Sequence, residues 1–184
     1  MTTFSIHTLE SAPAESVPSL RTLEQGLGFV PNLAATMAES PTLIGGFVDL
    51  RKTLAGGELT GVEREIVALA VSFENDCDYC LAAHSAFALM QNAEPDAVAA
   101  ARAGDPLADP RLAALYQFAR CLVRAKGQVS EDETRALLDA GFSRSALFEL
   151  VAQAGHTTIA NFAHSISNAP IDRAFATEEV AAAL

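Results

Sequence analysis

The sequence is short of basic residues and of aromatic side chains. Twelve Lys and Arg stand against 23 Asp and Glu, which gives a formal net charge of -11, and aromatic residues make up 7% of the 184 residues. A chain this acidic has no electrostatic attraction for a phosphate backbone or an anionic membrane surface, so we expect neither nucleic acid nor membrane as a partner. Half of the residues are hydrophobic, and we expect one sizeable core in a single domain over residues 1–184.

Long apolar runs and targeting signals are also missing. No segment approaches the ~18 uninterrupted apolar residues that span a bilayer, and residues 1–20 lack a basic start followed by an apolar run. Three cysteines are few, and odd in number, for a disulfide-stapled secreted domain. We therefore expect a cytoplasmic protein with a mobile N-terminal arm over about residues 1–15.

Strand signals are nearly absent, whereas Ala, Leu, Glu and Arg recur at helical spacing, so the sequence predicts an all-α helical bundle. The clearest helix signals are caps and stops. They predict a helix from Pro41 to Ala55, capping boxes at Thr60–Glu63 and Ser130–Glu133, a start at Asp109–Pro110, and a long last helix ended by Pro170. We expect a short helix in the tail from Ala176.

An internal repeat is suggested by a shift of 84 residues, which lays Glu65 and the residues after it onto Glu149. The same shift sets Asn161 opposite Cys77 and His164 opposite Cys80. Chance similarity between two alanine-rich helices explains the match equally well, so the repeat stays one of two interpretations.

Chemistry is concentrated in "SFENDCDYCLAAHSAFA", residues 72–88. On a helix turning by about 100° a residue, Cys77, Cys80 and His84 fall within roughly 60° of one another. With Asn75 and Asp76 as caps, both thiols would lie in the first turns of a helix over about residues 76–91, where the helix dipole favours a thiolate. His84 could accept the proton, and the second sulfur could close a disulfide on an oxidised first one.

Glu65 is the other residue of interest, because its neighbours at helical spacing are mostly apolar. A carboxylate turned toward a core needs a partner, and a histidine near the thiols would serve. We expect a Glu–His–Cys relay, unless Glu65 simply lies on the surface.

Two other interpretations of the cysteines remain open: a zinc site with Cys77, Cys80, His84 and Glu65 as ligands, and inert core thiols. Zinc is disfavoured because no second C-x-x-C or H-x-x-H element accompanies the first. The remaining cysteine, Cys121, has no base or second thiol beside it in the sequence, and we expect it to lie in the core. For His156 and His164 we expect structural roles.

The spacing of Glu65, Cys77, Cys80 and His84 resembles the signature of the alkylhydroperoxidase D branch of the carboxymuconolactone decarboxylase superfamily. "GFVPNLAATMAESPTL", residues 28–43, is similar to elements of its peroxidase-related members. The resemblance implies an all-helical fold of the alkylhydroperoxidase D type with a degenerate repeat, and homo-oligomers such as trimers or hexamers.

The resemblance also implies a chemistry: a thiol peroxidase that reduces small organic hydroperoxides. Cys80 would attack the peroxide and Cys77 would resolve the sulfenic acid, with Glu65 and His84 carrying the proton. An external dithiol, such as a dihydrolipoyl group on a partner protein, would reduce the disulfide, and neither cofactor nor metal is expected. Helix electrostatics alone favours Cys77 as the thiolate, so the two thiol roles could be reversed.

One position departs from the family pattern, since Tyr79 stands where the best-studied relay has a histidine. A phenol with a pKa near 10 is a poor proton shuttle at neutral pH. A redox-sensing or binding protein whose dithiol switches without turnover is therefore the alternative function, and a zinc-binding structural protein ranks below it.

Overall fold

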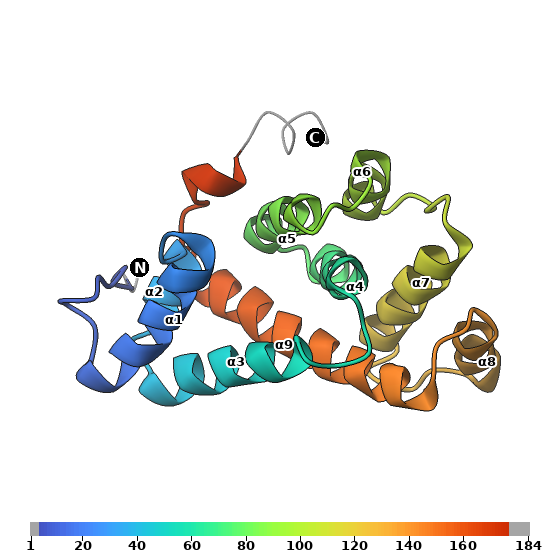
Figure 1. Cartoon of the computed structure of the whole chain (residues 1–184), viewed down its shortest axis with the longest axis horizontal. Coiled ribbons are helices and arrows are strands. Elements are labelled where there is room, and N and C mark those ends of the chain that lie inside the picture. The colour runs from blue at the N-terminus through green and yellow to red at the C-terminus, as the bar shows by residue number, and fades with distance from the viewer. Residues whose placement is uncertain (1–3, 177–184) are drawn as a thin grey trace.

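The structure, a computed structural model, describes residues 4–176, which form α-helices joined by short turns with no β-strand among them (Figure 1). This confirms the predicted all-α fold. The predicted helix after Ala176 lies outside the described residues. The α-helices are α1 (Val17–Leu27), α2 (Asn32–Met37), α3 (Pro41–Leu54), α4 (Gly61–Glu74), α5 (Asp78–Met90), α6 (Pro95–Ala103), α7 (Pro110–Arg124), α8 (Glu131–Asp139) and α9 (Arg144–Ser167), with 3-10 turns at Ala14–Ser16 and Arg173–Phe175.

Most helix starts lie where the local signals predicted them. The Ser40 hydroxyl accepts from the Leu43 backbone N–H at the start of α3. Both capping boxes form, with Thr60 and Ser130 as their first residues. These contacts reach only three residues along the chain, which is why the sequence alone locates them.

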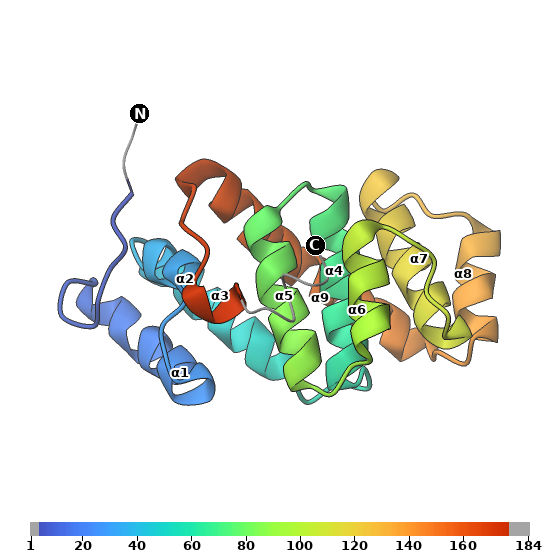
Figure 2. The ribbon, with the colours of Figure 1, turned by 90° about the horizontal axis from the view of Figure 1, so that it is seen from above.

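Helix α4 is the central element of the molecule. Its residues from Ile66 to Ser72 are all buried, and it packs against α5, α6, α7 and α9. In both ribbon views α1–α3 lie at one end of the molecule and α7–α8 at the other (Figures 1 and 2). The core accordingly has two clusters, one toward α7 and one toward α1–α3, and the second contains Cys77, Tyr79 and Cys80.

Helix α9 is the proposed repeat partner of α4 and α5. It runs unbroken from Arg144 to Ser167, so the positions equivalent to the turn between α4 and α5 are helical. Glu149, the counterpart of Glu65, accepts hydrogen bonds from the backbone N–H groups of Glu58 and Leu59. The repeat stays a prediction, but its two halves have different local structures.

The N-terminal arm makes contacts with the helices. The His7 backbone N–H donates to the Ala35 carbonyl, and its Nε2 lies 2.8 Å from Oε2 of Glu39. Leu9 and Ala12 pack against the second core cluster. The mobility expected of this arm stays a prediction. Within residues 4–176, no helix has both the length and the hydropathy that a membrane span requires.

Candidate active site

The two thiols lie at the start of α5, where the chain turns sharply out of α4. Asn75 ends α4, Asp76 adopts a left-handed backbone with φ of 51°, and the Cys77 N–H donates to the Ser72 carbonyl at 3.0 Å. Cys77 is therefore the N-cap residue of α5, and it makes no side-chain cap hydrogen bond. The sequence-based expectation that Asn75 and Asp76 cap this helix is wrong, because Asp76 makes the turn instead.

Cys77 and Cys80 form a buried pair of free thiols, 1% and 2% exposed. The thiol of Cys80, and then its backbone N–H, lower the pKa of Cys77 against the opposing effect of burial. The same thiol contact, together with burial, raises the pKa of Cys80. The two thiols therefore titrate as a pair, which loses its first proton more readily than its second.

Asn161 of α9 holds this pair from the side. Its amide is completely buried and contacts both sulfurs, which lowers the pKa of each. Its Nδ2 donates to the Ser72 hydroxyl at 3.2 Å, and its Oδ1 accepts from the Asn75 amide at 2.8 Å. An amide that donates to a sulfur stabilises the thiolate form, which is why Asn161 lowers both pKa values.

Glu65 and His84 form the second pair of the site. Nδ1 of His84 lies 2.6 Å from Oε2 of Glu65, and the two side chains are 14% and 18% exposed. The carboxylate holds the ring and its Nδ1 proton, which leaves Nε2 as the free nitrogen. The expected contact of Glu65 with a histidine is confirmed. Among residues 4–176, no hydrogen bond links His84 to either sulfur, so the predicted residues form two separate pairs.

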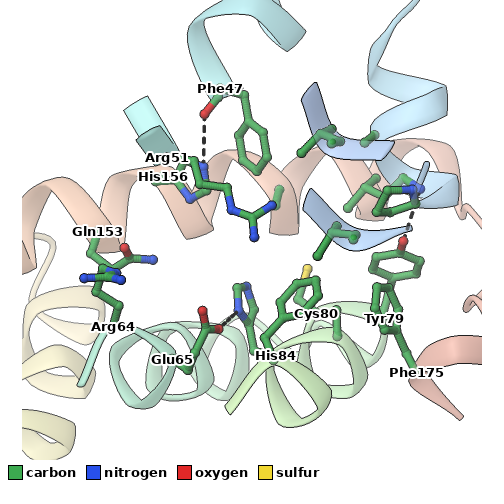
Figure 3. A pocket seen from close by; sticks show the side chains of 18 of the residues that line it. Phe47, Arg51, Arg64, Glu65, Tyr79, Cys80, His84, Gln153, His156 and Phe175 are labelled. Carbon is green, nitrogen blue, oxygen red and sulfur yellow. Dashed lines mark hydrogen bonds and ion pairs between the residues drawn. The ribbon is translucent and has the colours of Figure 1, made fainter. Parts of the chain in front are cut away.

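The two pairs open onto one cavity of about 260 Å³ (Figure 3). Cys80, Glu65 and His84 line it, whereas Cys77 does not. Cavity access therefore favours Cys80 as the attacking thiol, while acidity favours Cys77. The two criteria are compatible, because after the pair loses one proton the remaining proton can move to Cys77 and leave the charge on Cys80.

The cavity wall is mostly apolar and comes from several helices. Among its apolar residues are Leu23, Leu27, Leu33, Met37, Phe47, Phe87 and Phe175, and among its polar ones Arg51, Arg64, Gln91, Gln153 and His156. Arg51 and Phe47 lie one turn apart on α3, and His156 comes from α9. Sequence reasoning missed Arg51 and Phe47 as site residues, because nothing in their local pattern distinguishes them from other residues of an amphipathic helix.

Tyr79 serves to hold the C-terminal segment. Its hydroxyl donates to Oδ2 of Asp172 at 2.6 Å and accepts from the Leu33 backbone N–H at 3.2 Å. Burial and the Asp172 carboxylate raise its pKa. Asp172 also accepts from the Asn32 backbone N–H. Tyr79 therefore fastens α5 to α2 and to the turn that carries Phe175, and it stays protonated at neutral pH.

The other histidines make structural contacts, as the sequence predicted. Nε2 of His156 donates to the Phe47 carbonyl at 3.2 Å and its ring stacks on Phe47. Burial and the nearby His84 lower the pKa of His156 to about 4, so the ring is neutral. His164 lies 3.2 Å from the Ala169 carbonyl and stacks on Tyr79. His156 nevertheless also lines the cavity.

The zinc interpretation finds no geometric support. Across residues 4–176, no three His, Cys, Asp or Glu side chains are grouped so that they could hold a metal ion. Glu65 and His84 bond each other instead of pointing together at a common metal position with the two thiols. Cys121 is half-buried on α7, so its predicted position in the core is wrong.

Fold and site together define an all-helical protein with a buried dithiol beside an apolar cavity. Residues 41–120 match the carboxymuconolactone decarboxylase family. An alkylhydroperoxidase AhpD core structure, an uncharacterised peroxidase-related protein from Ralstonia eutropha JMP134, superposes with a TM-score of 0.84 at 24% identity, covering 94% of this chain and 93% of that one. The family match over residues 41–120 and the shared fold agree with the resemblance seen in the motifs of the sequence.

Two further structures share the fold. A peroxidase-related protein from Silicibacter sp. TM1040 has a TM-score of 0.79 at 23% identity over 94% of this chain and 93% of that one. The debrominase Bmp8, in complex with 2,3,4-tribromopyrrole, has a TM-score of 0.84 at 21% identity over 100% of this chain and 98% of that one. No curated protein sequence matches the chain.

Proposed function

We propose that this protein is a thiol-dependent peroxidase that reduces small organic hydroperoxides with Cys77 and Cys80. The observation that carries the proposal is the arrangement of the cavity: Cys80 lines it, and the Glu65–His84 pair lines the same space (Figure 3). Cys77 is the thiol partner of Cys80. An apolar wall suits the carbon skeleton of an organic hydroperoxide, and the dithiol supplies the two electrons for its reduction.

The reaction begins with the Cys80 thiolate, whose proton has passed to Cys77 or to His84. The sulfur attacks the terminal peroxide oxygen, the O–O bond breaks, and Cys80 becomes a sulfenic acid. His84, oriented by Glu65, donates a proton to the leaving alkoxide, which departs as an alcohol. Cys77 then displaces water from the sulfenic acid and forms the Cys77–Cys80 disulfide.

An external dithiol must close the cycle by reducing this disulfide while becoming oxidised itself. A dihydrolipoyl group on a partner protein fits that role, because its two thiols can exchange in turn with the two sulfurs. Free buried thiols need a reducing compartment, and we therefore place the protein in the cytoplasm.

The test is intact-mass measurement after one equivalent of cumene hydroperoxide and again after dihydrolipoamide, paired with continuous peroxide consumption. Loss and return of two hydrogens with sustained consumption is the expected result. Cys80→Ser should abolish consumption and Cys77→Ser should accumulate a sulfenic acid that a dimedone probe traps. A disulfide that forms once without sustained turnover would instead indicate a redox-sensing protein.

Reductive dehalogenation is a second candidate, favoured by the ring-lined cavity. Phe47, Phe87 and Phe175 all line the space beside Cys80, and Bmp8, whose structure spans this whole chain, is a debrominase. There the dithiol would replace a carbon–bromine bond by carbon–hydrogen, releasing bromide and a proton as the disulfide forms. Bromide release from 2,3,4-tribromopyrrole, measured beside peroxide consumption, decides between the two.

A further inference from the structure

Arg51 is a charge that the described part of the protein leaves without a partner. It projects from α3 and lines the cavity. Its guanidinium carbon lies 5.5 Å from the centre of the Phe87 ring. None of the ion pairs within residues 4–176 includes it. In Figure 3 the guanidinium extends from the upper wall into the cavity, facing the side on which His84 and Cys80 lie.

The other charged residues of the cavity are already engaged. Glu65, the one carboxylate among the lining residues, is bonded to His84. Arg64 also belongs to none of the ion pairs within residues 4–176, but its Nη1 is held by the Leu59 carbonyl, whereas no hydrogen bond within those residues holds the Arg51 guanidinium. The neutral ring of His156 does not offset the charge of Arg51 either. Arg51 therefore leaves a positive charge in a half-buried, largely apolar space of a protein whose net charge is -11.

A partly desolvated guanidinium without a counter-ion costs free energy, and a bound anion would offset this cost. Its planar fork of N–H donors matches a carboxylate, which it can bind through two parallel hydrogen bonds. The ring of Phe87 fixes the guanidinium in place, so little side-chain entropy is lost when an anion arrives.

We infer that the cavity binds ligands with an apolar body and one anionic group, preferably a carboxylate, and that Arg51 is the subsite for this group. The carbon chain would lie among the phenylalanine side chains, between Arg51 and Cys80. The inference rests on the proposed function in one respect, since it makes the natural substrate an acid-bearing hydroperoxide rather than a neutral one. Arg51 would then act as a specificity-determining residue.

The experiment is calorimetric binding of octanoate and octanamide to the reduced protein. The two probes share a chain length and differ in charge. We expect octanoate to bind more tightly, and Arg51→Met to weaken octanoate by about tenfold or more while changing octanamide less than threefold. Methionine keeps the packing on Phe87, and Arg51→Lys should retain most of the octanoate affinity.

Lys52→Met is the matched control, because Lys52 is the next residue, is exposed, and does not line the cavity. It should leave both affinities unchanged. Equal binding of octanoate and octanamide by the wild type, the same loss in Lys52→Met as in Arg51→Met, or no binding of either probe would each overturn the inference.

Failure of the proposed function gives a different pattern. Octanoate and octanamide are not reduced, so their binding does not depend on the thiols. Arg51-dependent octanoate binding by a protein that consumes no hydroperoxide would leave the subsite standing and overturn the peroxidase. Consumption of cumene hydroperoxide by a protein that binds octanoate no better than octanamide would support the peroxidase and overturn the subsite.

Discussion

At the scale of single residues, the site depends on how each ionisable group is paired. Glu65 is half-buried beside a histidine that it orients, whereas Glu63, two residues earlier on α4, is more deeply buried and serves the helix itself. Glu63 accepts from the Thr60 backbone N–H and from Nε of Arg111. Two carboxylates of one helix thus have separate roles, decided by the face from which each projects.

Glu65→Gln should slow hydroperoxide reduction by about 10² or more, because the amide cannot stabilise the imidazolium form of His84. The measurement is the rate of disulfide formation after mixing with cumene hydroperoxide. Glu63→Gln is the control: it weakens the ion pair with Arg111 and should lower the free energy of unfolding while leaving the rate within about threefold. An unchanged rate in Glu65→Gln would remove Glu65 from the relay.

Asn161 offers a prediction about thiol acidity. Asn161→Asp keeps the shape of the side chain but replaces an N–H donor by a negative charge beside the sulfurs, which should raise the apparent pKa of the pair by about one unit or more. Thiolate absorbance and alkylation rate against pH measure this. Asn168→Asp makes the same change at the exposed end of α9 and should not shift the titration. A wild-type titration of Asn161→Asp would mean that Asn161 only packs against the pair.

The residues that the sequence revealed are those related by short spacing. Glu65, Cys77, Cys80 and His84 lie on consecutive helices, so their helical faces could be judged from the sequence. Arg51, Asn161 and Phe175 reach the site through tertiary packing, which no local pattern records. Asn161 was aligned with Cys77 by the internal shift, but its contact with the sulfurs follows from the packing of α9 beside the turn from α4 to α5.

At the scale of elements, helix starts followed from the sequence and the turn before the thiols did not. A capping box reaches only from its N-cap residue to the third residue of the helix, whereas the choice of N-cap between Asn75, Asp76 and Cys77 depends on where the chain leaves α4. Asp and Asn suit both a cap and a left-handed backbone, so these residue types indicated caps and did not reveal the left-handed turn at Asp76. The packing of α4 decides it and shortens the predicted helix of residues 76–91 to Asp78–Met90.

The Tyr79–Asp172 contact is the link between α5 and the C-terminal segment. Tyr79→Phe leaves the Leu33 N–H and the Asp172 carboxylate each without one partner, which should cost about 1–3 kcal/mol of unfolding free energy in a urea titration. It should also speed hydrogen exchange in residues 169–176. Because Tyr79 does not titrate near neutral pH, the pH profile of turnover should be unchanged.

Tyr116→Phe provides the control for this element. The Tyr116 hydroxyl donates to the Ala101 carbonyl at 2.7 Å in the other core cluster. Its loss should destabilise the protein without faster exchange in residues 169–176. A changed pH profile of turnover in Tyr79→Phe would mean that Tyr79 takes part in proton transfer.

At the scale of the whole molecule, the exposed surface of α9 is unusual for a monomer. Phe148, Val151, Ile159, Phe162 and Ile166 are 72%, 42%, 37%, 58% and 67% exposed. Their spacing of three, eight, three and four residues places them along one side of the helix. Soluble monomers rarely expose such a continuous apolar stripe. This apolar stripe of α9 is therefore the candidate contact surface of the expected homo-oligomer.

Charge distribution favours the same surface for self-association. The chain has 23 acidic residues, and two copies repel each other wherever acidic faces meet. Helix α9 carries only Arg144 and Glu149 as charged residues over its 24 positions. A contact through its apolar stripe thus buries hydrophobic area where electrostatic repulsion is weakest, and the cavity on the other side of α9 stays open.

Phe162→Glu combined with Ile166→Glu should convert the protein to monomers, because two buried carboxylates per copy would outweigh the apolar contact. Light scattering on a size-exclusion column gives the mass of wild type and variant. Met90→Glu adds a charge at another exposed apolar residue, 64% exposed on α5, and should leave the assembly intact. Wild type that elutes as a monomer, or Met90→Glu that dissociates equally, would contradict a contact through α9. Since α9 also carries Asn161 and His156, a monomeric variant with a shifted thiol titration would further indicate that assembly helps to hold α9 against the dithiol.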